Sequence, residues 1–290
     1  MSDHGSPTVR RRRLAAELHR LRDLSGLTGD QVAAQLGWSP SKISRIENVR
    51  SGIKVQDASR LLDLYGVEGS HRDDLLALAQ EAERKGWWET YSADWPADFS
   101  NYIDMEAEAQ SISSWEPLVV PGLLQTEAYG RAVIANWQSF TALPDSAIER
   151  RVKVRLERQQ VIAGDNALRF AVILDESVLH RKFGKDSVMN EQLKRLVEDS
   201  QRPNIALQVL PLGGFHPVCT GAFALLRFTQ IHGVVVPDVV YLENMTNGLY
   251  IDDEVDTYYY QRAFDHIRCN SLDPVRSREL IWQINHDRWR

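Results

Sequence analysis

The chain has 290 residues, of which 43% are hydrophobic and 26% are charged, and its formal net charge is −6. This length suffices for two domains with separate cores, and the composition is typical of a soluble globular protein. No apolar run is long enough to span a membrane and no secretory signal is visible, so we expect a cytoplasmic protein. Cys219 and Cys269 lie far apart without metal-ligand spacing, which predicts reduced thiols and neither a metal nor a cofactor.

Four consecutive arginines occupy positions 10–13. They either belong to a first helix or precede it as a flexible arm that reaches phosphates or a narrow minor groove, and a merely solubilising charge run is an equal alternative. Residues 1–66 contain eleven Lys and Arg against seven Asp and Glu, a balance of +4, so the remainder carries −10. A basic segment on an acidic body favours nucleic-acid binding, because phosphate neutralisation supplies most non-specific affinity.

Residues 27–36 predict a short helix. Thr28 can cap it, because a threonine hydroxyl accepts hydrogen bonds from the unpaired N–H groups of the first turn. Three apolar residues then follow at helical spacing on one inward face: Val32, Ala33 and Leu36. Gly37 ends the helix, since glycine adopts the left-handed conformation at least cost.

Residues 40–48 predict a second helix. Ser39 is its expected N-cap and Pro40 its first residue, where the missing N–H has no partner to lose. Ile43 and Ile46 point inward. The other face is polar and basic, with Ser41, Ser44, Arg45 and Asn48 on it and Lys42 at its flank. Such a helix suits the major groove of DNA, and the alternative is an ordinary helical hairpin with a solvated polar face.

The Gly37 turn and the run Ser44-Arg45-Ile46-Glu47-Asn48 resemble the helix-turn-helix of the Cro/XRE family of phage-repressor-like DNA-binding domains, from Leu14 to about Tyr65. The resemblance implies that Pro40, Ser41 and Arg45 stand at the base-reading positions. Pro40 replaces a frequent Gln and has no side-chain hydrogen bond to offer a base.

The same resemblance implies a structural ion pair between Arg22 and Glu47. Gly29 stands where the family often has a phosphate-holding side chain and leaves only its backbone N–H. We expect Lys42 and Arg50 to hold phosphates. The full predicted DNA-binding set is Thr28, Gly29, Ser39, Pro40, Ser41, Lys42, Ser44, Arg45, Asn48, Arg50 and Lys54.

Two more helices complete the predicted first domain, which spans residues 1–85. One covers residues 55–65 and ends at Gly66, and the next begins at a Ser70 cap and runs to about Lys85. The tryptophan-rich segment 86–96 follows. We interpret it as an ordered strap packed between domains or against a partner, with core packing and a ligand-binding aromatic cage as alternatives.

Residues 86–290 predict a second domain with one sheet and several helices, so the fold class is α+β with an N-terminal all-α five-helix repressor-like domain. The expected strands, rich in β-branched and aromatic residues, are 168–174, 205–210, 222–228 and 234–242. The expected helices are 102–113, 126–137, 145–162, 188–198, 253–268 and 274–286, and residues 115–124 are expected to be extended.

The run Trp115-Glu116-Pro117 and the run Val120-Pro121-Gly122-Leu123-Leu124-Gln125-Thr126 resemble a domain of unknown function found behind this type of helix-turn-helix in many actinobacterial regulators. The resemblance extends from Trp115 to Ile284 and includes Arg155, Arg158-Gln159 and Tyr241-Leu242-Glu243. It implies a transcription regulator, often encoded beside a small partner protein, and no established chemistry.

One stripe in the second domain is a candidate ligand site. Arg151, Arg155 and Arg158 are spaced i, i+4 and i+7, so one helix face presents three guanidinium groups that suit a phosphate or carboxylate. Ion pairing within this acidic domain is the alternative. His216, in a glycine-containing loop, joins the candidate set, although no second metal ligand stands near it. We recognise no catalytic motif.

These observations predict a non-enzymatic, sequence-specific DNA-binding transcription regulator. Its second domain is expected to form a homodimer that reads an inverted repeat in double-stranded DNA and to sense a small-molecule effector or a small partner protein. The alternatives are a nucleotide-using, transferase-like enzyme with an autoregulatory helix-turn-helix, and a second domain that serves only for docking.

Overall fold

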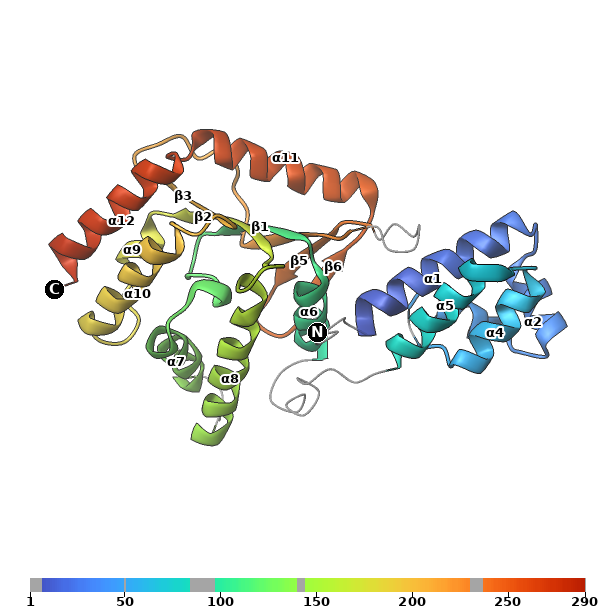
Figure 1. The fold of residues 1–290 in the computed structure, drawn as a ribbon. Helices are drawn as coiled ribbons and strands as arrows, with labels where there is room; N and C mark the ends of the chain where they lie inside the picture. Colours follow the sequence, from blue (N-terminus) through green and yellow to red (C-terminus); the bar gives the residue numbers. More distant parts are fainter. Residues whose placement is uncertain (1–6, 50, 84–96, 140–143, 230–236, 290) are drawn as a thin grey trace. The chain divides into compact units, whose positions relative to one another are not determined.

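The structure, a computed structural model, describes residues 7–49, 51–83, 97–139, 144–229 and 237–289. It divides into two units, the first built mainly from the N-terminal helices and the second mainly from the residues that follow (Figure 1). The expected boundary after residue 85 and the tryptophan-rich segment 86–96 lie outside the described residues. None of the described helices is long and apolar enough to cross a membrane.

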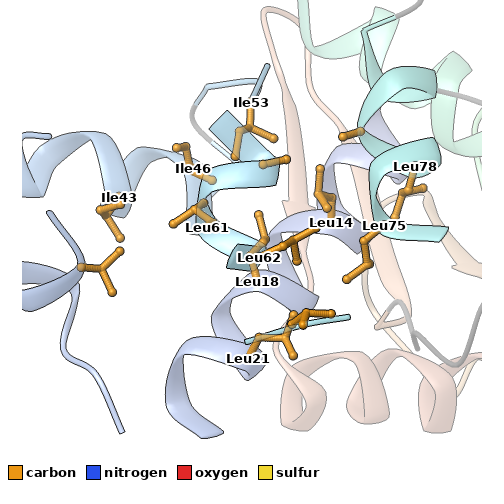
Figure 2. Packing of buried hydrophobic residues seen from close by; sticks show 14 of the residues in the cluster. Leu14, Leu18, Leu21, Ile43, Ile46, Ile53, Leu61, Leu62, Leu75 and Leu78 are labelled. Atoms are coloured by element: carbon orange, nitrogen blue, oxygen red, sulfur yellow. The ribbon is translucent and has the colours of Figure 1, made fainter. Parts of the chain in front are cut away.

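The described residues of the first unit that precede residue 84 form the helices α1 (Pro7–Leu24), α2 (Gly29–Leu36), α3 (Pro40–Glu47), α4 (Val55–Leu64) and α5 (Gly69–Ala82). Their apolar faces meet in one core, to which Leu14, Ile46 and Leu62 contribute buried side chains (Figure 2). Gly66 has a φ of 69° and follows α4, as expected of a left-handed helix stop. The expected Ser70 cap is wrong, because α5 begins at Gly69 and its N-cap is Glu68, two residues earlier than expected.

The second unit is built around one mixed sheet. Its strands are β1 (Ser111–Glu116), β2 (Arg169–Asp175), β3 (Ile205–Leu210), β4 (Phe223–Arg227), β5 (Val239–Glu243) and β6 (Gly248–Ile251). The α-helices after residue 96 are α6 (Ala97–Glu108), α7 (Glu127–Ala135), α8 (Asp145–Arg158), α9 (Ser177–His180), α10 (Asp186–Asp199), α11 (Glu254–Asn270) and α12 (Pro274–Arg288). Short 3-10 turns occur at Gly122–Leu124, Asn136–Ser139 and Gln159–Ile162. The expected α+β class with one sheet is confirmed.

The strand order is β3-β2-β1-β4-β5-β6, with β1, β2 and β3 parallel and the later pairings antiparallel. The chain builds the sheet outward from β1 in one direction and then outward from β4 in the other. The strand order therefore reverses between β1 and β4, which is the kind of position where open α/β sheets bind ligands.

The two faces of the sheet differ in chemistry. Buried Trp115, Phe223 and Phe264 pack together on the face that α11 covers (Figure 1). On the other face Ser114, Ala224 and Tyr241 are direct neighbours across β1, β4 and β5. Tyr102 of α6 stacks on Tyr241 there, with ring centroids 4.3 Å apart.

Two expectations for this unit need correction. The helix expected over residues 102–113 ends at Glu108, and residues 111–113 instead belong to β1, which is hydrogen-bonded on both sides. The strand β6 was not expected. Gly248 lies directly against the Tyr241 ring, and a Cβ there would be only 2.5 Å from the ring. Glycine has a low strand propensity, which hides β6 in the sequence, but this close packing requires it.

Candidate nucleic-acid interface and a polar cluster in the second unit

The local signals that define α2 act as expected. The backbone N–H of Gln31 donates to Thr28 Oγ1 at 3.3 Å, and the N–H of Thr28 donates to Gln31 Oε1 at 2.9 Å, which completes a capping box. Gly37 has a φ of 69° and its N–H caps the carbonyl end of the helix. These two ends fix the length of α2 and the turn that leads to α3.

The polar and apolar faces of α3 are also confirmed. Ile43 and Ile46 are only 2% and 4% exposed. Four residues of the predicted DNA-binding set are exposed along the opposite side: Ser41, Ser44, Arg45 and Asn48. Ser39 stands at the N-cap position and Pro40 begins the helix, as expected, but the Ser39 hydroxyl makes no capping hydrogen bond and lies 3.0 Å from Ser41 Oγ instead.

A depression of about 440 Å³ lies between the first turn of α2 and the exposed side of α3. Its lining includes much of the predicted DNA-binding set: Thr28, Gly29, Pro40, Ser41, Ser44 and Asn48. The N-terminus of α2 opens at this depression. Such an end offers backbone N–H groups and a positive partial charge to an anion.

The basic residues of the predicted set are placed differently from one another. The ammonium of Lys42 pairs with Asp57 at 2.8 Å and lies 3.6 Å from the centre of the Trp38 ring. Lys54 is exposed, and Arg50 lies outside the described residues. Lys42 is therefore already engaged within the protein before any phosphate arrives.

The expected ion pair between Arg22 and Glu47 is present. Two guanidinium nitrogens donate to the two carboxylate oxygens at 2.7 and 3.3 Å, and a third N–H donates to the Leu27 carbonyl at 2.9 Å. The hydrogen bond with Glu47 raises the pKa of Arg22. One side chain thus ties α1 to the end of α3 and to the residue before the α2 cap.

The four consecutive arginines lie in α1, so the helical alternative applies. Arg10 is buried and pairs with Glu81 at 3.2 Å, and Arg11 Nε donates to the Ala82 carbonyl at 3.2 Å. These contacts join α1 to α5 within the first unit.

In the second unit, the arginine stripe of α8 faces the 3-10 turn at Gly122–Leu124 and helix α7. Arg155 donates a hydrogen bond to Gln125 Oε1. A Cβ at Gly130 would lie 3.1 Å from that same oxygen and 3.2 Å from Arg155 Cδ, so the absence of a side chain at Gly130 makes room for this contact. Arg158 is only 6% exposed, and its guanidinium lies over the Tyr102 ring.

The carboxyl groups of Glu116 and Glu243, at the ends of β1 and β5, are close to each other, and the charge of Glu243 also affects Arg155. Burial raises the pKa of Glu116 to about 8; the hydrogen bond from Ser114 opposes this shift, and the nearby charge of Glu243 adds to it. Burial lowers the pKa of Arg155 to about 10, with a further lowering by Arg158 and an opposite effect of Glu243. We define the group Glu116, Arg155, Arg158 and Glu243 as the acid–arginine cluster.

His216 does not join the acid–arginine cluster. Its Nδ1 lies 3.6 Å from Asp175. Glu116 pairs with Leu174 of β2, and side chains alternate between the faces of a sheet, so Asp175 and His216 belong to the face opposite Glu116. Arg151 is close enough to lower the pKa of Arg155. The structure therefore brings the three arginines together with two glutamates that the spacing of the α8 residues does not reveal.

Two family models match separate parts of the chain. Residues 13–75 match a helix-turn-helix domain, and residues 99–283 match a domain of unknown function (DUF5753). Searches among curated proteins and among solved structures found no match.

Proposed function

The chain belongs to the DUF5753 family and carries a helix-turn-helix domain before it, and on this basis we propose that it is a sequence-specific DNA-binding transcription regulator. The observation that carries the proposal is the exposed polar side of α3, which stands beside the open N-terminus of α2 over one depression. A groove-reading helix next to a phosphate-binding helix end is the arrangement by which this motif class docks.

In this proposal Arg45 and Ser41 read base edges, because both are exposed and one helical turn apart on α3. The backbone N–H of Gly29 holds a phosphate at the start of α2. Thr28 and Asn48 line the same depression, and Lys54 is exposed after α3; these three residues fix the orientation on the duplex. Ser39 and Pro40 start α3 and set its depth in the groove.

The proposal includes a homodimer formed by the second unit. Val255, Tyr258 and Tyr259 of α11 are 59%, 59% and 65% exposed and border a hollow of about 450 Å³. Exposed aromatic residues grouped in this way are typical of interface centres. Two recognition helices about 34 Å apart would then read an inverted repeat in the cytoplasm.

The test is selection of DNA from a random pool by the full chain, followed by footprinting of the enriched sequences. We expect an inverted repeat, and we expect Arg45→Ala to relax one base position in each half. Arg276→Ala, in the second unit and 73% exposed by its side chain, is the matched loss of a positive charge and should change nothing. A pool without enriched sequences would refute specific DNA binding.

A further inference from the structure

The acid–arginine cluster lies where the strand order reverses. Ser114, Ala224 and Tyr241 are direct partners across β1, β4 and β5, so Glu116 and Glu243, each two residues further along, fall in the next row on the same face. One strand separates them, which corresponds to about 10 Å between their backbones. Both carboxyl groups therefore stand at the carboxyl ends of β1 and β5, on either side of the reversal.

The arginines that complete the cluster come from helix α8. Arg155 comes from α8 and is held by Gln125, and Arg158 follows one turn later. A Cβ at Gly122 would lie 3.7 Å from one guanidinium nitrogen of Arg158 and 3.9 Å from Arg155 Cγ, which is ordinary contact. The turn at Gly122–Leu124 thus lies near both arginines, and helix α7 lies against Arg155 at Gly130.

Arg155 has an incomplete set of partners. Among the residues that the structure describes, it donates to the Gln125 amide oxygen and makes no ion pair, although Glu243 is near enough to favour its charge. A guanidinium in a partly buried setting normally acquires a carboxylate or phosphate partner, because its desolvation is otherwise uncompensated.

We propose that the acid–arginine cluster binds a small phosphorylated molecule. Arg155, together with Arg158, binds the phosphate, and the carboxyl groups of Glu116 and Glu243 bind hydroxyl or amino groups of the same molecule. The inference gives a ligand class to the sensing role of the second unit and in that respect rests on the proposed function.

Charge selects phosphate over a carboxylate. A phosphomonoester carries about −1.5 to −2 charges at neutral pH and three terminal oxygens, so it attracts the guanidinium of Arg155 more strongly than a carboxylate, which carries one charge. Planar guanidinium groups also bind phosphate oxygens in pairs. Burial raises the pKa of Glu116 to about 8, which favours its neutral form at neutral pH and reduces its repulsion of an anion, whereas the charge of Glu243 opposes anion binding.

The experiment is calorimetric titration of the full chain with inorganic phosphate, in a chloride background of constant ionic strength and without DNA. We expect saturable binding at millimolar concentrations or below. Arg155→Gln should weaken it about 10- to 100-fold, the effect of one or two lost charged hydrogen bonds. Glu243→Gln should strengthen phosphate binding, because a negative charge is removed.

Matched variants separate this site from others on the chain. In Gly130→Ala the new methyl group crowds Arg155, so this variant should weaken phosphate binding while leaving α7 intact. In Gly122→Ala the new methyl group makes only ordinary contacts, so this variant should bind phosphate like the wild type. Arg45→Ala controls for phosphate held at the α2–α3 surface and should keep the binding. Absence of saturable binding to the wild type, or equal affinity in the wild type and in both Arg155→Gln and Gly130→Ala, would overturn the proposal. DNA selection tests the recognition helix separately, so the two failures are distinguishable.

Discussion

Arg22 and Glu47 face each other with both carboxylate oxygens bonded to the guanidinium, and their side chains are only 13% and 12% exposed. The pair joins α1 to α3 through two residues that are 25 positions apart in the sequence. Both residues also line the depression between α2 and α3, and their contact holds the end of α3 against α1.

We predict that Glu47→Ala destabilises the first unit. Arg22 would be left partly buried without its partner, at a cost of about 2–3 kcal/mol. Differential scanning calorimetry of the full chain should show the transition of this unit lowered by about 10 °C. The control is Asp63→Ala, which breaks the ion pair between Asp63 and Arg72, a pair that is more exposed than Arg22–Glu47. This change should lower the transition temperature by no more than about a degree or two. Loss of DNA affinity with unchanged unfolding would mean that Glu47 acts on DNA.

For base reading, we predict that Arg45→Ala weakens binding to the selected operator by about 1–3 kcal/mol and removes preference at one position per half-site. Its guanidinium is exposed on α3, with Nε bonded to the Ser41 carbonyl at 3.2 Å, which holds the side chain along the helix surface. Binding assays with single-base operator variants measure the effect. A uniform loss over all sequences would reduce Arg45 to a phosphate contact.

Glu116 predicts a specific pH dependence. Its pKa of about 8 in the folded chain exceeds the ordinary value of 4.5, so the folded state retains a proton that the unfolded state loses. Stability from this group is complete below pH 4.5 and falls as the pH rises toward 8, by at most about 1.4 kcal/mol per unit. Between pH 5 and 8, the free energy of unfolding of Glu116→Gln, measured with denaturant, should depend less on pH than that of the wild type.

Glu243→Gln serves as the companion variant, because removing its charge lowers the pKa of Glu116 and ends the decline at a lower pH. Identical pH profiles for the wild type and Glu116→Gln would show that Glu116 ionises normally.

Dimerisation is predicted to depend on α11. Replacing both Tyr258 and Tyr259 by glutamate places charges on the most exposed aromatic pair of that helix, and sedimentation at micromolar concentration should then show monomers. Trp282→Glu, on α12 and 59% exposed, introduces the same charge elsewhere and should leave dimers. A wild-type monomer, or a dimer that tolerates the double change, would refute this interface.

The sequence predicts α2 and α3 well because their determinants are local. Thr28, Gly37 and Pro40 act on backbone groups within four residues of themselves. The start of β1 is different. Ser111 and Ser113 have no strand preference of their own and become a strand through pairing with residues 169–171 and 225–227, more than 50 positions away.

The candidate sites follow the same rule. The stripe of three arginines on α8 is visible from helical spacing alone, whereas the meeting of Glu116 with Glu243 depends on the register of three strands. A glutamate at one strand end is unremarkable in sequence. Only the sheet shows that two such ends lie in one row.

The pairing of Lys42 with Asp57 has a consequence for how the protein would respond to ionic conditions. An ammonium group that already has a carboxylate partner displaces few counterions from DNA when it approaches a phosphate. DNA binding by this unit then depends on Arg45, Arg50 and Lys54, on neutral hydroxyl and amide groups and on the backbone at the start of α2. Its affinity for an operator should therefore decline gently with added salt, which keeps recognition steady in a cell whose ion content varies.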